Sequence, residues 1–113
     1  MEIIEKELTL DKLRQMATET FGNLVKAVVD VDKGVIAVDA ELHSDLEALL
    51  LEKGSKQRNL WGINLYPELE GEEFIEFDSL INMRPSQGNR SRTVESGEIR
   101  AKIIEIVAKR VPR

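Results

Sequence analysis

The sequence predicts an α+β fold in the order helix, β-hairpin, helix, β-hairpin, helix. Segments with apolar residues at helical spacing alternate with β-branched or strictly alternating segments, polar turns separate them, and no segment is repeated. The simplest closure is a four-stranded, mostly antiparallel sheet with the helices packed on one face. With 113 residues, the chain is expected to form a single domain over residues 1–113.

The first half of the chain contains a helix and a hairpin. Thr9 is a candidate N-cap for a helix that runs through Phe21. Residues 25–31 and 35–40 are β-branched runs, and the turn between them ends in Gly34, which accepts a positive φ. Both runs are almost continuously apolar, which predicts cover on both of their faces.

The next elements are a short helix and a second hairpin. Ser44 is predicted to cap a helix that ends near Gly54. Residues 60–66 alternate in polarity and are typical of a half-buried strand, and residues 75–83 continue as its partner. The last helix is expected from about Val94 to Val111.

The second hairpin is predicted to carry a polar face. If the apolar faces of its strands match in an antiparallel pair, Asn64 lies near Glu76 or Asp78. This face is either a ligand surface or a plain solvent-facing one. Its members are Asn64, Tyr66, Glu76, Asp78 and Asn82.

Composition favours a folded cytosolic protein. Apolar residues make up 42% of the chain and charged residues 33%, which is too apolar for disorder. There is no cysteine, so disulfides and thiol chemistry are excluded. No signal segment is recognisable and no stretch approaches the roughly 20 apolar residues of a membrane span, so a cytoplasmic location without membrane contact is expected.

The charges are segregated along the chain. The net charge is −5, which disfavours general coating of nucleic acid. Residues 66–78 hold six acids and no base, whereas residues 84–92 hold three arginines and no acid. The two segments therefore either pair with each other or present separate charged surfaces.

The segment 84–92 is the main candidate binding site, because it has no aliphatic side chain and lies between a strand and a helix. Its arginines could donate to phosphate or carboxylate, its neutral side chains could orient a ligand, and its glycine permits close approach. The alternatives are internal ion pairing with residues 66–78 and a flexible loop. The candidate ligand-binding residues are Arg84, Ser86, Gln87, Gly88, Asn89, Arg90, Ser91 and Arg92, bordered by Asn64 and Trp61.

Other side chains give less specific signals. His43, the only histidine, could act as an acid or base, or could simply pack at a helix start. Glu76 and Asp78 could bind magnesium or transfer protons, or could only aid solubility. Trp61 is interpreted as a core residue that could instead floor a pocket. No metal site is predicted and no cofactor is identified.

Several strings resemble a known family. They are KAVVDVDKGVIAVDAELH at 26–43, EALLLEKGSKQRNLWGINLYPE at 47–68, IEFDSLINMRPSQGNRSR at 75–92 and EIRAKIIEIV at 98–107. In these the chain resembles a family of short bacterial and archaeal proteins known only as a domain of unknown function. The resemblance implies no activity, cofactor or partner.

Three functions follow from these patterns. The leading hypothesis is a binding module that takes up a phosphate-bearing ligand, a nucleotide or RNA, through residues 84–92. The second is a small metal-assisted hydrolase or nuclease that uses His43, Glu76 or Asp78. The third is a homodimeric interaction module that buries the second face of the first hairpin.

Overall fold

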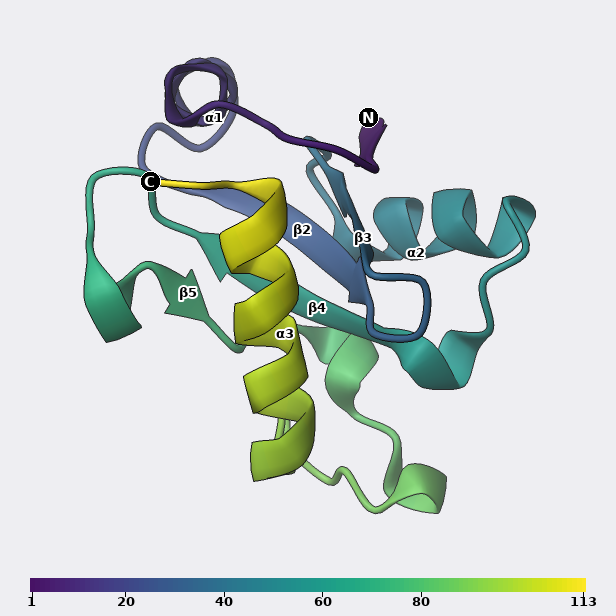
Figure 1. The fold of residues 1–113 in the computed structure, drawn as a ribbon. Helices are drawn as coiled ribbons and strands as arrows, with labels where there is room; N and C mark the ends of the chain where they lie inside the picture. The colour runs from purple at the N-terminus through teal and green to yellow at the C-terminus, as the bar shows by residue number, and fades with distance from the viewer.

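The chain folds into three α-helices and one five-stranded antiparallel sheet (Figure 1). A computed structural model describes all residues, 1–113. The strands are β1 (Glu2–Ile4), β2 (Val25–Asp30), β3 (Val35–Val38), β4 (Leu60–Leu65) and β5 (Ile75–Glu76), in the sheet order β1-β3-β2-β4-β5. The helices are α1 (Leu10–Glu19), α2 (His43–Glu52) and α3 (Gly97–Arg110), and the short 3-10 turns are η1 (Gln57–Asn59), η2 (Gly71–Glu73), η3 (Leu80–Asn82) and η4 (Pro85–Gln87). The predicted α+β class is confirmed.

The expected number of four strands is wrong, because the N-terminus adds a fifth. β1 pairs with β3, with Glu2 opposite Val38 and Ile4 opposite Ile36. β1 has only three residues and begins with an acid, so no local pattern marks it as a strand. β1 forms because it pairs with the edge of β3, whose residues lie more than thirty positions further along the chain.

The expectation that all helices pack on one face is also wrong. α1 and α3 cover one face of the sheet, where Leu13 and Ile103 join the larger core cluster (Figure 1). α2 covers the other face, where Leu46 and Leu50 pack against Val28 of β2. The apolar runs of the first hairpin do need cover on both faces, and α2 provides the second cover. The surface that motivated the homodimer hypothesis is therefore filled from within the chain.

The first hairpin forms as predicted. Its turn is closed by Asp30, whose Oδ1 accepts hydrogen bonds from the backbone N–H groups of Asp32 and Lys33, both at 2.9 Å. Gly34 completes the turn with a φ of 71°. The Oδ2 of Asp30 accepts a 2.6 Å bond from Ser55, which ties the turn to the end of α2.

Two helix starts differ from the prediction. The N-cap of α2 is Leu42, two residues before the predicted Ser44, so the helix begins at His43, and Leu42 has no side chain that can cap the helix. α3 begins at Gly97, where the hydroxyl of Ser96 accepts a bond from the Ile99 N–H, so the helix starts later than Val94. In contrast, Thr9 caps α1 as predicted, with Oγ1 3.2 Å from the Lys12 nitrogen.

The second strand of the second hairpin is much shorter than the predicted 75–83. β5 ends at Glu76, and the chain then bends across β4, where the side chain of Asn82 replaces the backbone as partner. Asn82 Oδ1 accepts from the Gly62 N–H at 2.8 Å, and Asn82 Nδ2 donates to the Gly62 carbonyl at 2.9 Å. As a result Asn82 is buried, and Ile81 packs on the α2 side of the sheet.

None of the three α-helices combines the length and the apolar character that crossing a bilayer requires.

The bend over β4 requires a glycine at position 62. A Cβ at Gly62 would lie 2.5 Å from Ser79 Cβ and 3.1 Å from Ile81 Cγ1. Gly62→Ala is therefore expected to lower the free energy of unfolding by about 1–3 kcal/mol through overpacking. Urea denaturation measures this loss.

Gly97→Ala provides the matched control, because no heavy atom lies within 4 Å of the added Cβ. This substitution should leave the unfolding free energy unchanged or slightly higher. An equal urea midpoint for Gly62→Ala and the unaltered chain would contradict the close approach of residues 79–81 to β4.

Candidate functional site

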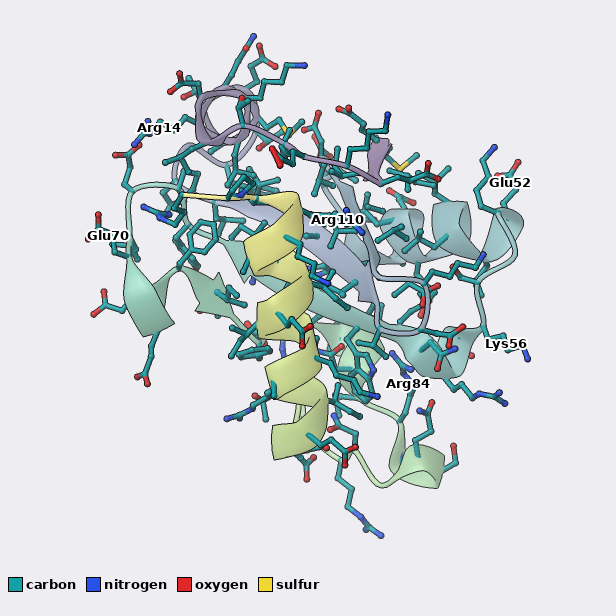
Figure 2. The ribbon with its side chains drawn as sticks, in the orientation of Figure 1. Arg14, Glu52, Lys56, Glu70, Arg84 and Arg110 are labelled. Carbon is teal, nitrogen blue, oxygen red and sulfur yellow. The ribbon has the colours of Figure 1, made fainter.

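Arg84, the first residue of the predicted loop, is used to hold the fold together (Figure 2). Its guanidinium donates to the carbonyls of Gln57, Leu60 and Ile81 and lies 4.6 Å from the ring centre of Trp61. Burial lowers the pKa of Arg84 from its ordinary value. Trp61 itself belongs to the larger core cluster, in agreement with the core interpretation.

Asn89 organises the rest of the loop from the inside. It is buried, and its Nδ2 donates to the carbonyls of Asn82 and Thr93 at 2.7 Å and of Ser91 at 3.1 Å. Its Oδ1 accepts from the Glu95 N–H at 2.9 Å. Asn89 thus shapes the loop and has no donor left for a ligand.

The loop already holds one anion, the carboxylate of Glu95. Glu95 Oε2 accepts from the backbone N–H of Arg90 at 2.6 Å, and from the N–H and hydroxyl of Ser91, each at 3.0 Å. These bonds, the one from Arg90 foremost, hold the pKa of Glu95 below its usual range. Glu95 lies outside the predicted segment, and only its position a few residues after the loop could have pointed to this role.

The three arginines of the loop therefore have different roles. Arg92 pairs with Asp78, with Nε 2.7 Å from Oδ1 and Nη2 3.4 Å from Oδ2. Internal ion pairing with the acidic segment thus applies to Arg92, while Arg84 bonds to backbone carbonyls. The exposed side chain of Arg90 forms no ion pair. Ser86 and Gly88 are exposed, and Gln87 bonds to Arg58 and Arg84.

A polar row crosses three strands on the α2 side of the sheet. Lys26 of β2 is opposite Asn64 of β4, which is opposite Glu76 of β5. Asn64 Nδ2 donates to Glu76 Oε1 at 2.8 Å and to the Asp78 carbonyl at 3.3 Å, which confirms the predicted proximity. Tyr66 donates to the same Glu76 oxygen at 3.0 Å; burial and then this bond raise the pKa of Tyr66.

His43 joins this row from the first turn of α2. Its Nε2 lies 2.8 Å from the carbonyl oxygen of Ile63, which can only accept, so Nε2 carries the proton. Burial lowers the pKa of His43, and the bond to Ile63 opposes that shift. The charges of Lys26 and Asp78 have smaller effects, which oppose each other because Lys26 lowers the pKa and Asp78 raises it. The imidazole is therefore neutral near pH 7, and Nδ1 keeps a lone pair.

Lys26 and His43 lie at the wall of a small pocket, called here the α2 pocket. Its volume is about 130 Å³, and it is lined by Lys26, Leu42, His43, Ser44, Ser79, Leu80, Ile81 and Arg92. Because no side chain caps α2, the N–H groups of His43 and Ser44 have no partner, whereas that of Asp45 donates to the Leu42 carbonyl at 3.2 Å. The pocket therefore brings together donors that the sequence places far apart.

The pocket includes part of the predicted site and omits the rest. Arg92 lines it together with His43, whereas residues 84–91 do not. Lys26, Ser44 and Ser79 had not been identified as candidates, since only the folded sheet brings them together. His43, Glu76 and Asp78 lie around Asn64, but no three His, Cys, Asp or Glu residues in the chain are grouped so that they could hold a metal ion.

The buried neutral histidine predicts a specific pH dependence of stability. Between the lowered pKa of His43 in the folded state and about 6.5 in the unfolded state, the unfolded chain binds more protons. The contribution of neutral His43 to the free energy of unfolding is complete above about pH 6.5. It is lost as the pH falls toward the folded-state pKa, and the free energy of unfolding then decreases by at most about 1.4 kcal/mol per pH unit.

His43→Gln tests this dependence, because the amide can still donate to Ile63 and does not titrate. Urea unfolding at about pH 7 and about pH 5 should show a smaller loss of stability on acidification for the variant than for the unaltered chain. An identical loss in both proteins would show that His43 is not held neutral.

Asn89 should be the most sensitive residue of the loop. Asn89→Ala leaves three carbonyls and one N–H without their partner and is expected to lower the unfolding free energy by about 2–3 kcal/mol. Ser86→Ala, at an exposed position of the same loop, should change it by less than about 0.5 kcal/mol. Similar small effects for both, measured by chemical denaturation, would show that the loop does not depend on Asn89.

No curated protein and no solved structure matches the chain. A family model described as "Protein of unknown function (DUF5674)" matches residues 2–110, which is nearly the whole chain. This agrees with the resemblance noted from the sequence strings. The protein belongs to the family of proteins of unknown function DUF5674.

Proposed function

We propose that the chain binds the phosphate group of a small ligand in the α2 pocket. The observation that carries the proposal is the arrangement of donors around one cavity: Lys26 and Arg92 supply charge, and the uncapped start of α2 supplies N–H groups. Helix N-termini favour anions through these N–H groups and the helix dipole. The hydroxyls of Ser44 and Ser79 add neutral donors at the same wall.

Arg92 can serve the ligand while it remains paired with Asp78. Its Nε and Nη2 bond to the carboxylate, whereas Nη1 has no partner within the chain. A guanidinium has five N–H donors, so one ion pair does not exhaust it. Asp78 therefore orients Arg92 at the pocket and leaves a donor for a phosphate oxygen.

His43 contributes a hydrogen-bond acceptor and no charge. Because Nε2 donates to Ile63, the lone pair on Nδ1 can accept the proton of a monoprotonated phosphate or of a neighbouring hydroxyl. Positive charge in the pocket thus comes from Lys26 and Arg92 alone.

The size of the pocket limits what enters it. A volume of about 130 Å³ equals roughly four times the ~30 Å³ that one water occupies in the liquid. This suits a single phosphate group, while the rest of the ligand lies outside, next to Leu42 and Leu80, which are 55% and 67% exposed. With a net charge of −5, the chain favours a small molecule over an RNA backbone with many phosphates.

The test uses inorganic phosphate as the probe and a matched pair of arginines. In amide NMR titrations, phosphate should shift the signals of His43 and Ser44 in the unaltered chain. Arg92→Gln should weaken binding by about tenfold, or about 1.4 kcal/mol. Arg90→Gln removes the same charge from the same loop at a residue that does not line the pocket, and should leave the affinity unchanged.

Two results would contradict the proposal. One is the absence of any phosphate-dependent shift in the first turn of α2. The other is an equal loss of affinity in both arginine variants, which would place binding in the loop as a whole.

A further inference from the structure

A second concave surface, independent of the α2 pocket, lies on the opposite side of the sheet. It is a groove of about 630 Å³ between α3 and the segment that contains η2 and β5, and we name it the α3–β5 groove. It is lined by Gly71, Glu72, Ile75, Phe77, Arg100 and Ile104. A second hollow of about 260 Å³ extends it along α3 over Phe74, Val107 and Val111. Figure 1 shows α3 crossing in front of the sheet with β5 beside it.

The groove leaves a large apolar side chain in solvent. Ile104 lies one position after the buried Ile103, but it is 50% exposed and lines both hollows. Ile75 and Phe77 are only partly buried beside it. An exposed apolar strip of this kind commonly marks a contact surface.

The same surface includes an open sheet edge. β5 is the last strand of the sheet and pairs only with β4. The Phe74 carbonyl accepts from the Tyr66 N–H at 2.9 Å, so this carbonyl faces β4, while the Phe74 N–H donates back to the Gly71 carbonyl in η2. Because the carbonyl and the N–H of one trans peptide point in opposite directions, the Ile75 N–H points to the open edge. Such an edge is a template for another strand.

The two banks of the groove carry opposite charges. The α3 bank has Arg100 and Arg113, which form no ion pair. The guanidinium carbon of Arg100 lies 5.3 Å from the ring centre of Phe77, and that of Arg113 lies 4.5 Å from the ring centre of Phe74. The η2 bank has exposed carboxylates without ion pairs, at Glu70, Glu72 and Glu73; Glu70 is labelled at the edge of Figure 2. A partner surface of a single charge sign would be repelled by one of the two banks. In contrast, a second copy of the chain related by a two-fold axis places its acidic bank opposite the basic bank of the first copy, and its basic bank opposite the acidic one.

We propose that the chain forms a two-fold symmetric homodimer through the α3–β5 groove. The two β5 edges meet antiparallel, Ile104 of each copy packs over the apolar strip of the other, and Arg100 faces the partner subunit's Glu72. A stable interface of this kind buries roughly 600–1,000 Å² on each copy, a modest part of the 6401 Å² that one chain exposes. This dimer uses a different surface from the first hairpin, whose second face α2 covers.

The first experiment measures the mass in solution by light scattering over a series of concentrations. The unaltered chain should reach twice the chain mass, and Ile104→Glu should remain at the chain mass. The matched control is Leu51→Glu, because Leu51 is 40% exposed on α2, on the other side of the sheet, and this variant should still dimerise. A monomer at every concentration would overturn the proposal, and so would a dimer that survives Ile104→Glu or is lost in Leu51→Glu.

The second experiment tests the charge pairing across the axis. Glu72→Arg places like charges together at both contacts of the dimer, and so does Arg100→Glu, so each variant alone should be monomeric. A mixture of the two restores an opposite-charge pair at each contact and should form a heterodimer. Circular dichroism verifies that both variants are folded. A mixture of folded variants that remains monomeric would overturn the two-fold arrangement.

Discussion

The amide side chain of Asn82 is the contact on which the candidate site depends. By bonding to both backbone groups of Gly62, it takes the place of a strand residue and holds the chain against β4 where β5 has ended. The same Nδ2 donates to the carbonyl of Arg92 at 2.9 Å, and the Asn82 carbonyl accepts from Asn89. One buried side chain therefore joins the sheet, the loop and the arginine that faces the α2 pocket.

The electrostatics of the site follow from this arrangement. The loop between η3 and α3 satisfies most of its donors internally, and Glu95 fills the anion position formed by its backbone. The open donors that line the α2 pocket are those of Lys26, the first turn of α2 and Nη1 of Arg92, whereas the open guanidinium of Arg90 lies outside the pocket. The proposed anion site thus lies where the fold gathers donors without partners around a pocket, and the number of arginines in a segment does not determine its position.

The parts of the fold that local chemistry specifies could be predicted from the sequence. The Thr9 cap and the glycine turn at Gly34 act within a few residues of the elements they define, and both formed as expected. The strand β1 and the cover of the second face by α2 depend on contacts between distant segments, so local patterns could not reveal them. The polar row at Asn64 was predictable because antiparallel register fixes which residues are opposite. The position of His43 beside that row was not, because it depends on the path of α2 over the sheet.

An experimental structure determined with inorganic phosphate would show whether the α2 pocket binds a phosphate group. One anion should occupy the α2 pocket, within hydrogen-bond distance of Lys26, Arg92 and the first N–H groups of α2. The Arg92–Asp78 pair should remain intact beside it. An empty α2 pocket together with phosphate bound at Arg90, in place of the Glu95 carboxylate, would contradict the proposed phosphate site.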